Sequence, residues 1–284
     1  MSETQHWFDD VDFIPEQDVM LERGDSGKPV ESIQRQLKEA GYDITIDGVF
    51  GPGTERTIKQ FQKDVGLVQD GRVGPKTQWR LDNHPKDPKV LSQEDLQDAA
   101  AMLDVSVASV MAVNAVESRG SGFFTEDKPT ILYERHIMFR RLKHHGIDPR
   151  PYVDQYPNIV NTRTGGYRGG VAEHQRLNAA CQLHEESGLE SASWGLFQIM
   201  GFHWEHLGYQ SVNQFVGLMK ESERHHLLAF VKFIRADQRL HEALKERNWA
   251  RFARIYNGPA YAKHNPPYDT RLARAFDKYS QSVA

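Results

Sequence analysis

Glu117 is the residue whose position most clearly suggests chemistry, because it ends an apolar helical run. Val107, Val110 and Val113 precede it at three- and four-residue spacings, which place all four side chains on one helix face. Near a helix C-terminus on a buried stripe, desolvation and the helix macrodipole both favour the neutral carboxyl. A carboxylic acid that keeps its proton near neutral pH can protonate a leaving oxygen, so we predict a general acid. The alternative is a partly exposed glutamate in a last helical turn.

Helices are predicted on both sides of this glutamate, and they must position it. Ser92 followed by Asp95 has the register of a capping box. Gly120 and Gly122 are predicted to end the helix of the glutamate and to leave space beside its carboxyl. Strand alternation is visible only at residues 130–133, so we expect this half of the chain to be predominantly α. Further helices are expected at residues 176–183, 215–219, 226–244 and 249–256.

The N-terminal part contains an internal repeat. Residues 47–54 read DGVFGPGT and residues 70–77 read DGRVGPKT, a spacing of 23 residues. In each copy Asp-Gly forms a tight turn, and the proline opens a helix where its missing N–H costs nothing. The helices that flank the first copy carry apolar stripes, which predicts a small three-helix domain. The stripe residues are Val30, Ile33 and Leu37, then Ile58, Phe61 and Val65.

Composition divides the chain into four parts. Five of the first 16 residues are acidic, which predicts a disordered tail over residues 1–16. Two prolines among polar residues predict a linker over 84–91, with few apolar residues to join its neighbours. We therefore expect a small domain over 17–83 and a larger one over 92–284. The hydrophobic fraction of 39% suffices for a core in each.

Several classes of protein are excluded by the same composition. No apolar run reaches membrane-spanning length, and the N-terminus lacks a basic n-region and an apolar h-region, so we expect neither a membrane anchor nor a signal peptide. The net charge is −4 and no basic stripe is present, so we expect no binding to nucleic acid. A single cysteine cannot form an internal disulfide.

The sequence around Glu117 resembles the lysozyme superfamily. Residues 115–123 read AVESRGSGF and residues 191–201 read SASWGLFQIMG, patterns that occur in goose-type lysozymes and lytic transglycosylases. A narrower resemblance, over residues 90–284, is to the N-acetylmuramidase domain of modular phage endolysins. Its blocks are PTILYERHIMF at 129–139, GGYRGG at 165–170 and IYNGPAYAKHNPPYDTRLARAF at 255–276.

The small domain carries a second resemblance. Residues 21–81 are similar to the three-helix peptidoglycan-binding module of cell-wall hydrolases, although Gln78 separates Thr77 from Trp79, which leaves the packing of Trp79 open. Together the two resemblances imply a mainly α protein. It would consist of a small three-helix wall-binding domain and a larger α-helical, lysozyme-like catalytic domain.

The muramidase resemblance implies roles for acidic residues. Cleavage of a β-1,4 glycosidic bond needs a proton donor and usually a second carboxylate. Glu117 takes the donor role. Glu134 matches a glutamate of the family motif and is the first candidate for the second carboxylate, with Glu173 as the other. Such a glutamate can instead be the buried ion-pair partner of an arginine, and related enzymes also use one carboxylate with a positioned water.

Substrate-binding residues are expected beside the acid. Ser193 and Gln198 offer hydrogen-bonding side chains, and Trp194 offers an apolar face, with core packing as its alternative. The resemblance places Tyr256 near the acid, followed by Asn257 in the same block. The glycine-rich loop at 163–170 could hold a peptide stem or an N-acetyl group, and a flexible surface loop is the alternative.

Metal catalysis is the rival chemistry, because peptidoglycan-binding modules of this kind are also fused to zinc peptidases and amidases. The 13 histidines include pairs at 144–145 and 225–226 and the string HWEH at 203–206. None forms His-Glu-x-x-His, and one cysteine excludes cysteine-rich zinc sites. We interpret the histidines as scattered surface residues and expect no metal site and no cofactor.

The sequence thus predicts an endolysin that binds bacterial peptidoglycan, hydrolyses the β-1,4 bond between N-acetylmuramic acid and N-acetylglucosamine, and lyses the host cell. We expect a monomer, made in the host cytoplasm, that reaches the periplasmic wall of a Gram-negative host after holin-type release. Two alternatives remain open. A lytic transglycosylase would use Glu117 to give 1,6-anhydro products, and a non-catalytic wall-binding virion protein would not need Glu117.

Overall fold

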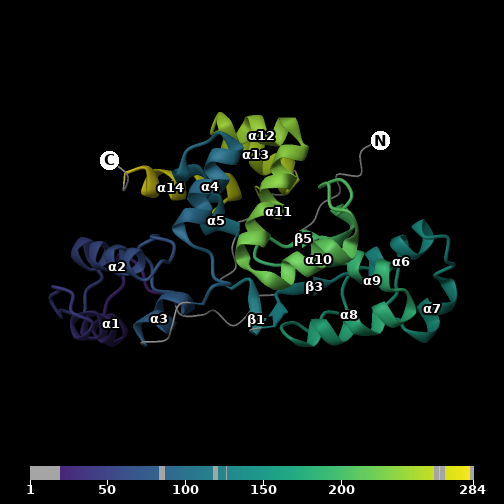
Figure 1. Ribbon diagram of the computed structural model, residues 1–284, viewed down its shortest axis with the longest axis horizontal. Coiled ribbons are helices and arrows are strands. Elements are labelled where there is room, and N and C mark those ends of the chain that lie inside the picture. The colour runs from purple at the N-terminus through teal and green to yellow at the C-terminus, as the bar shows by residue number, and fades with distance from the viewer. Residues whose placement is uncertain are drawn as a thin grey trace.

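The computed structural model describes residues 20–82, 87–117, 121–125, 127–258, 262 and 266–281. Within these ranges the buried apolar side chains form two separate cores. The smaller core lies between Val30 and Leu81, and the larger one between Leu91 and Tyr279. Figure 1 shows the small helical domain at one end of the molecule. The predicted tail over 1–16 lies outside the described residues.

The small domain consists of α1 (Lys28–Glu39), α2 (Pro52–Asp64) and α3 (Pro75–Leu81). A proline opens α2 and another opens α3, as the repeat predicts. The predicted stripes are confirmed, since Leu37 and Ile58 are fully buried. Trp79 lies on α3 with half of its surface exposed.

Two glutamines explain why the repeat folds the same way twice. Gln34 Nε2 donates to Asp47 Oδ1 at 2.8 Å and to Thr54 Oγ1 at 3.1 Å. Gln62 Nε2 makes the same two hydrogen bonds, at the same distances, to the aspartate and threonine of the second copy. Each buried amide therefore ties an Asp-Gly turn to the helix that follows it.

The larger part of the chain is helical, so the mainly α prediction is confirmed. The capping box of Ser92 and Asp95 is present at the start of its first helix. The helices are α4 (Gln93–Leu103), α5 (Val107–Glu117), α6 (Arg135–His144), α7 (Arg150–Gln155), α8 (Ala172–Leu183), α9 (Glu185–Glu190), α10 (Val212–Glu221), α11 (Glu223–Ala236), α12 (Gln238–Lys245), α13 (Trp249–Tyr256) and α14 (Tyr268–Ser280).

Two small antiparallel sheets accompany these helices. β1 (Phe123–Thr125) pairs with β2 (Lys128–Pro129), and β3 (Ile131–Tyr133) pairs with β4 (Ala192–Trp194), which pairs with β5 (Ile199–Met200). Only β3 was predicted. β4 and β5 are buried at every residue, so their sequence has none of the polar alternation that reveals a half-exposed strand.

The helix predicted over residues 226–244 is two helices. Asp237 leaves the helical conformation, and its side chain accepts hydrogen bonds from the backbone N–H groups of Arg239 and Leu240 at the start of α12. The prediction of one helix was therefore wrong, because it relied only on the spacing of apolar residues and overlooked Asp237. An aspartate followed by a fresh helical run is an N-cap signal.

Contacts between the two domains differ from the loose linkage expected from the sequence. Leu91, at the end of the predicted linker, is 2% exposed and belongs to the larger core. Lys76 Nζ of α3 lies 2.7 Å from the carboxylate of Glu223 on α11. A cavity of about 190 Å³ is lined by both domains. A largely buried ion pair thus joins the two domains. The domain boundaries at 17–83, 84–91 and 92–284 remain predictions.

Within the described ranges no single helix is both long and apolar enough to cross a membrane. Helices α4 and α5 satisfy the length and composition criteria only when taken together, as a pair bent by 114°.

Candidate active site

Glu117 is the last residue of α5, and its side chain is partly buried. Val110 and Val113 on the same face are buried, as the spacing predicts. Helix α14 packs along α5, and Arg271 of α14 donates a hydrogen bond to the carbonyl oxygen of Val116 at 3.3 Å. The carboxyl therefore lies at a helix C-terminus beside apolar packing, the environment proposed for a proton donor. Gly120 lies outside the described residues.

Tyr268, the first residue of α14, interacts with Glu117, and sequence reasoning missed it. Burial raises the pKa of Tyr268 well above 10, and the nearby charge of Glu117 raises it further. Among the described residues the buried Tyr268 hydroxyl has no hydrogen bond of regular geometry, so its alignment with Glu117 is imperfect. Its ring stacks on Tyr256 at a centroid distance of 6.4 Å. The ring of Tyr268 thus lies between Tyr256 and Glu117. Asn257 follows Tyr256 as the C-cap of α13.

Tyr268→Phe is expected to lower kcat on peptidoglycan by about tenfold, because it removes the hydroxyl that can hydrogen-bond the carboxylate formed when Glu117 gives up its proton. Thermal stability should not fall, because the deleted hydroxyl is buried without a regular partner. Initial rates of wall clearing and a melting curve measure the two effects. A variant that melts lower with unchanged kcat would assign Tyr268 to packing alone.

The loop that follows Glu117 is anchored by two buried residues of α11. Glu223 accepts a hydrogen bond from the backbone N–H of Gly122 at 2.8 Å, and its side chain is 1% exposed. His226 Nδ1 accepts from the backbone N–H of Leu196 at 3.0 Å, and its Nε2 donates to a backbone carbonyl of α10. Burial lowers the pKa of His226 to about 4, so the ring is neutral near pH 7.

The surface interpretation of His226 was therefore wrong. His226 is 1% exposed, and its ring packs against two glycines from distant parts of the sequence. A Cβ at Gly122 would lie 2.6 Å from the ring, and a Cβ at Gly195 would lie 2.5 Å from it. Only glycine allows both segments to approach this histidine, and Gly195 also has a φ of +72°.

Ser193 of β4 and Gln198 of the turn that follows β4 are hydrogen-bonded to each other. Ser193 Oγ donates to Gln198 Oε1 at 2.7 Å, and Gln198 Nε2 donates to the carbonyl oxygen of Gly195 at 2.8 Å. Gln198 holds a left-handed conformation with a φ of +51°, which is uncommon for a residue with a side chain. These side chains shape the turn, and Gln198 remains only partly buried.

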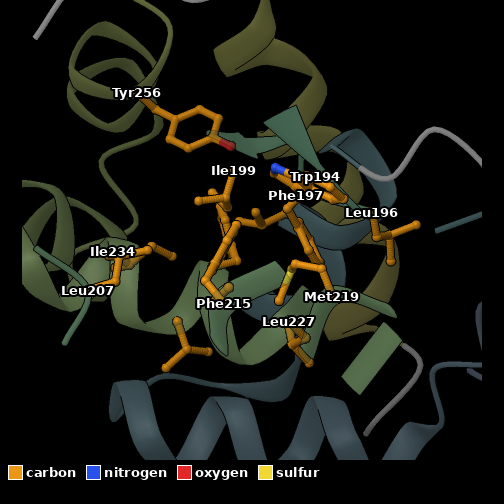
Figure 2. Close-up of a cluster of buried hydrophobic side chains, with 14 of the residues drawn as sticks. Trp194, Leu196, Phe197, Ile199, Leu207, Phe215, Met219, Leu227, Ile234 and Tyr256 are labelled. Carbon is orange, nitrogen blue, oxygen red and sulfur yellow. The ribbon is translucent and has the colours of Figure 1, made fainter. Parts of the chain in front are cut away.

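Trp194 belongs to the core. Its side chain is 1% exposed, and its indole N–H donates to the carbonyl oxygen of Leu189 at 3.1 Å. Figure 2 shows Trp194 in a cluster with Phe197 and Ile199. This burial leaves no ring face for a sugar, so the structure favours the core-packing alternative over the predicted sugar contact.

Glu134 lies between β3 and α6 with 12% of its side chain exposed. The hydroxyl of Tyr167, from the glycine-rich loop, donates to both carboxylate oxygens at 2.9 Å. His136 Nδ1 lies 3.2 Å from the same carboxylate. The pKa of Tyr167 is raised, first by burial and then by the charge of Glu134. The carboxylate is thus held in place by a tyrosine while remaining partly accessible.

Glu173 is fully buried and has a structural role. Its Oε2 pairs with Arg176 Nη1 at 2.7 Å, and its Oε1 accepts from the backbone N–H of Gly169 at 3.0 Å. This carboxylate fixes the glycine-rich loop from inside, so its geometry does not suit the alternative catalytic role. Arg135 binds three carbonyl oxygens around the same loop, which contradicts the flexible-loop alternative.

Helix α5 ends in a partly buried glutamate with an anchored loop beside it, and a separate three-helix domain precedes this arrangement. Comparison with known families assigns the protein to the two-domain, lysozyme-like glycoside hydrolases. Residues 106–280 match the family model of N-acetylmuramidase, and residues 26–81 match that of a peptidoglycan binding domain. The chain belongs to the N-acetylmuramidase family.

A solved relative covers both domains. The crystal structure of the Burkholderia AP3 phage endolysin is 48% identical in sequence and superposes with a TM-score of 0.88. The match covers 93% of this chain and 99% of that one. The protein is accordingly a peptidoglycan-hydrolysing enzyme of the endolysin type.

Two curated relatives match a short stretch of the chain. The spore cortex-lytic enzyme of Bacillus cereus is 43% identical over 63 residues, which are 22% of this chain and 24% of that protein. The zinc D-Ala-D-Ala carboxypeptidase of Streptomyces albus G is 42% identical over 62 residues, 20% of this chain and 24% of that protein. The chain thus spans about a quarter of these relatives, whose names describe different chemistries.

Proposed function

We propose that this enzyme cleaves the β-1,4 bond between N-acetylmuramic acid and N-acetylglucosamine by adding water, with Glu117 as the proton donor. The observation that carries this proposal is the partly buried Glu117 at the C-terminus of α5, next to the buried hydroxyl of Tyr268. Donation of a proton to the glycosidic oxygen lets the N-acetylglucosamine leave, while the oxocarbenium-like centre forms on the N-acetylmuramic acid.

Glu134 is the proposed second carboxylate. It is partly accessible and oriented by Tyr167, so it can accept a proton from an attacking water or stabilise positive charge on the sugar. Glu173 is unsuitable because its oxygens are committed to Arg176 and to backbone N–H groups in the interior. Two carboxylates of unequal environment fit the acid and base roles of a hydrolase.

We keep a smaller set of the predicted substrate-binding residues, without Trp194. Gln198, Tyr256 and Asn257 stay candidates for glycan contact. The turn that holds Gln198 packs against His226, which also packs against Gly122 in the loop after Glu117, and Tyr256 stacks on Tyr268. Ser193 would act through Gln198, to which it is hydrogen-bonded. We further propose a monomer that needs no cofactor for catalysis, binds no nucleic acid and reaches the periplasmic wall through a pore made by another protein.

Digestion of purified peptidoglycan tests the proposed reaction type. New reducing sugar ends should appear in step with the loss of turbidity, while free amino groups stay constant. A rise in amino groups would identify peptide cleavage. Turbidity that does not change although the protein sediments with the walls would favour the non-catalytic alternative.

A further inference from the structure

His145 and His184 come together at the junction of α6 and α9, although 38 residues lie between them. His145 is the C-cap of α6 and His184 is the N-cap of α9, with ring centroids 5.0 Å apart. Glu186, in the first turn of α9, completes the group. One potential ligand atom from each of these three side chains lies within 4.8 Å of the other two. Figure 1 places α6 and α9 on the far side of the molecule from α1.

A buried carboxylate orients the ring of His145. His145 Nε2 lies 2.8 Å from Glu190 Oε2, and Glu190 is 1% exposed. Arg141 donates to both oxygens of the Glu190 carboxylate, at 2.8 and 3.0 Å, and the indole N–H of Trp204 donates to it at 3.0 Å. Glu190 is therefore an acceptor, and Nε2 carries the ring proton. The lone pair of Nδ1 then lies on the side of Glu186, whose Oε2 is 3.7 Å away.

The ring of His184 is fixed by a different contact. Its Nδ1 lies 2.9 Å from Ser187 Oγ and 3.2 Å from the Ser187 backbone nitrogen, so the side chain caps α9. The backbone N–H of Ser187 donates to Nδ1, so zinc binding at Nε2 moves the ring proton from Nε2 to Nδ1, which can then donate it to Ser187 Oγ. Both rings are thus fixed in position before any ion arrives, and metal binding changes the tautomer of His184 and moves the largely exposed Glu186.

We propose that His145, His184 and Glu186 bind a divalent transition-metal ion of the zinc type. Two imidazoles and one carboxylate are a common zinc ligand set, whereas Mg²⁺ and Ca²⁺ prefer oxygen ligands. Zinc ligands lie about 2.0–2.2 Å from the ion and therefore roughly 3.5 Å from one another in a tetrahedral site. Small side-chain rotations bring the three ligand atoms, now within 4.8 Å of one another, to that spacing. The carboxylate–histidine pair of Glu190 and His145 is the arrangement that orients metal-binding imidazoles.

The bound ion would link the end of α6 to the start of α9. The carbonyl groups at the end of α6 favour a cation there. The site revises the sequence expectation of no metal, because ligands so far apart in the chain form no recognisable motif. The competing occupant is a proton: protonated His145 would bridge Glu186 and Glu190 without any metal.

Calorimetric titration of the full, tag-free chain with ZnCl₂, after treatment with a chelator, tests this site. Wild type should bind one Zn²⁺ saturably, and its melting temperature should rise with added ZnCl₂. Glu186→Gln removes the exposed ligand, and His184→Asn removes the imidazole while keeping an N-cap residue. Each variant should bind Zn²⁺ about tenfold more weakly or worse, and the melting temperature should no longer respond.

His225→Asn is the matched control. His225 also faces a glutamate, Glu221, at 3.5 Å, but it belongs to no such group of three ligands. Its binding of Zn²⁺ should equal that of wild type. Absence of saturable binding to wild type, or unchanged binding in both Glu186→Gln and His184→Asn, would overturn the metal site and leave the proton as the occupant.

Discussion

Glu117→Gln is expected to stop the cleavage of purified peptidoglycan, with kcat falling by about 10³-fold or more, near the upper part of the range for a general acid. Glutamine has nearly the same size and shape, so the end of α5 and its contact with α14 should be retained. The amide cannot deliver a proton to the leaving oxygen. Initial rates of turbidity loss, compared at equal protein concentration, measure the effect.

Two controls separate lost chemistry from lost structure in that variant. Glu246→Gln changes an exposed glutamate of the same domain, the C-cap of α12, and should keep the wild-type rate. Circular dichroism and sedimentation with insoluble walls should show that Glu117→Gln still folds and binds. Activity within about tenfold of wild type would remove Glu117 from the role of proton donor.

Lys76→Met is expected to lower the free energy of unfolding by about 3 kcal/mol near neutral pH, as the loss of one partner of a buried ion pair does. Lys76 crosses from the small domain to Glu223, whose side chain is 1% exposed. Burial raises the pKa of Glu223, but Lys76 and the backbone N–H groups of Leu91 and Gly122 outweigh burial and lower it below 4.5. Without Lys76 the interior holds a carboxylate that lacks its cation.

The pH dependence of this effect has a definite sign. In wild type the pKa of Glu223 is lower in the folded state, so its stabilising contribution is present above pH 4.5 and is lost as the pH falls. In Lys76→Met burial prevails and raises that pKa, so the variant is penalised at neutral pH and relieved as the pH falls. The difference between the two proteins should therefore be largest near pH 7 and should shrink towards pH 4.

Urea unfolding at a series of pH values measures the difference. Lys245→Met is the matched control, because Lys245 pairs with the exposed Asp104 on the surface and such pairs contribute at most about 1 kcal/mol. A Lys76→Met variant as stable as this control, or one whose deficit does not change with pH, would contradict the role of the interdomain pair.

The sequence predicted the elements whose signals are local. Helix α5 and the burial of its valine stripe follow from three- and four-residue spacing, and the helix ends at Glu117 as expected. The capping box at Ser92 and the proline-opened helices of the repeat are also local signals, and they too were found. These features need no knowledge of the rest of the chain.

The remainder of the site depends on contacts between distant residues. Gly122 and Glu223 are 101 residues apart, and no spacing rule connects them. His226 was interpreted as a surface histidine because the His225–His226 pair forms no metal-binding motif, yet His226 is buried whereas His225 is partly exposed. The type of residue could not decide whether Trp194 faced sugar or core, since an indole suits both.

Mass spectrometry of a borohydride-reduced peptidoglycan digest tests the central claim most directly. An enzyme that adds water at the bond proposed here leaves muropeptides that end in reducible N-acetylmuramic acid, and we expect these to dominate. A transglycosylase leaves 1,6-anhydro ends, which are lighter by one water and resist reduction. Predominant anhydro ends, or reducible ends on N-acetylglucosamine, would contradict a muramidase that uses Glu117 to hydrolyse the wall.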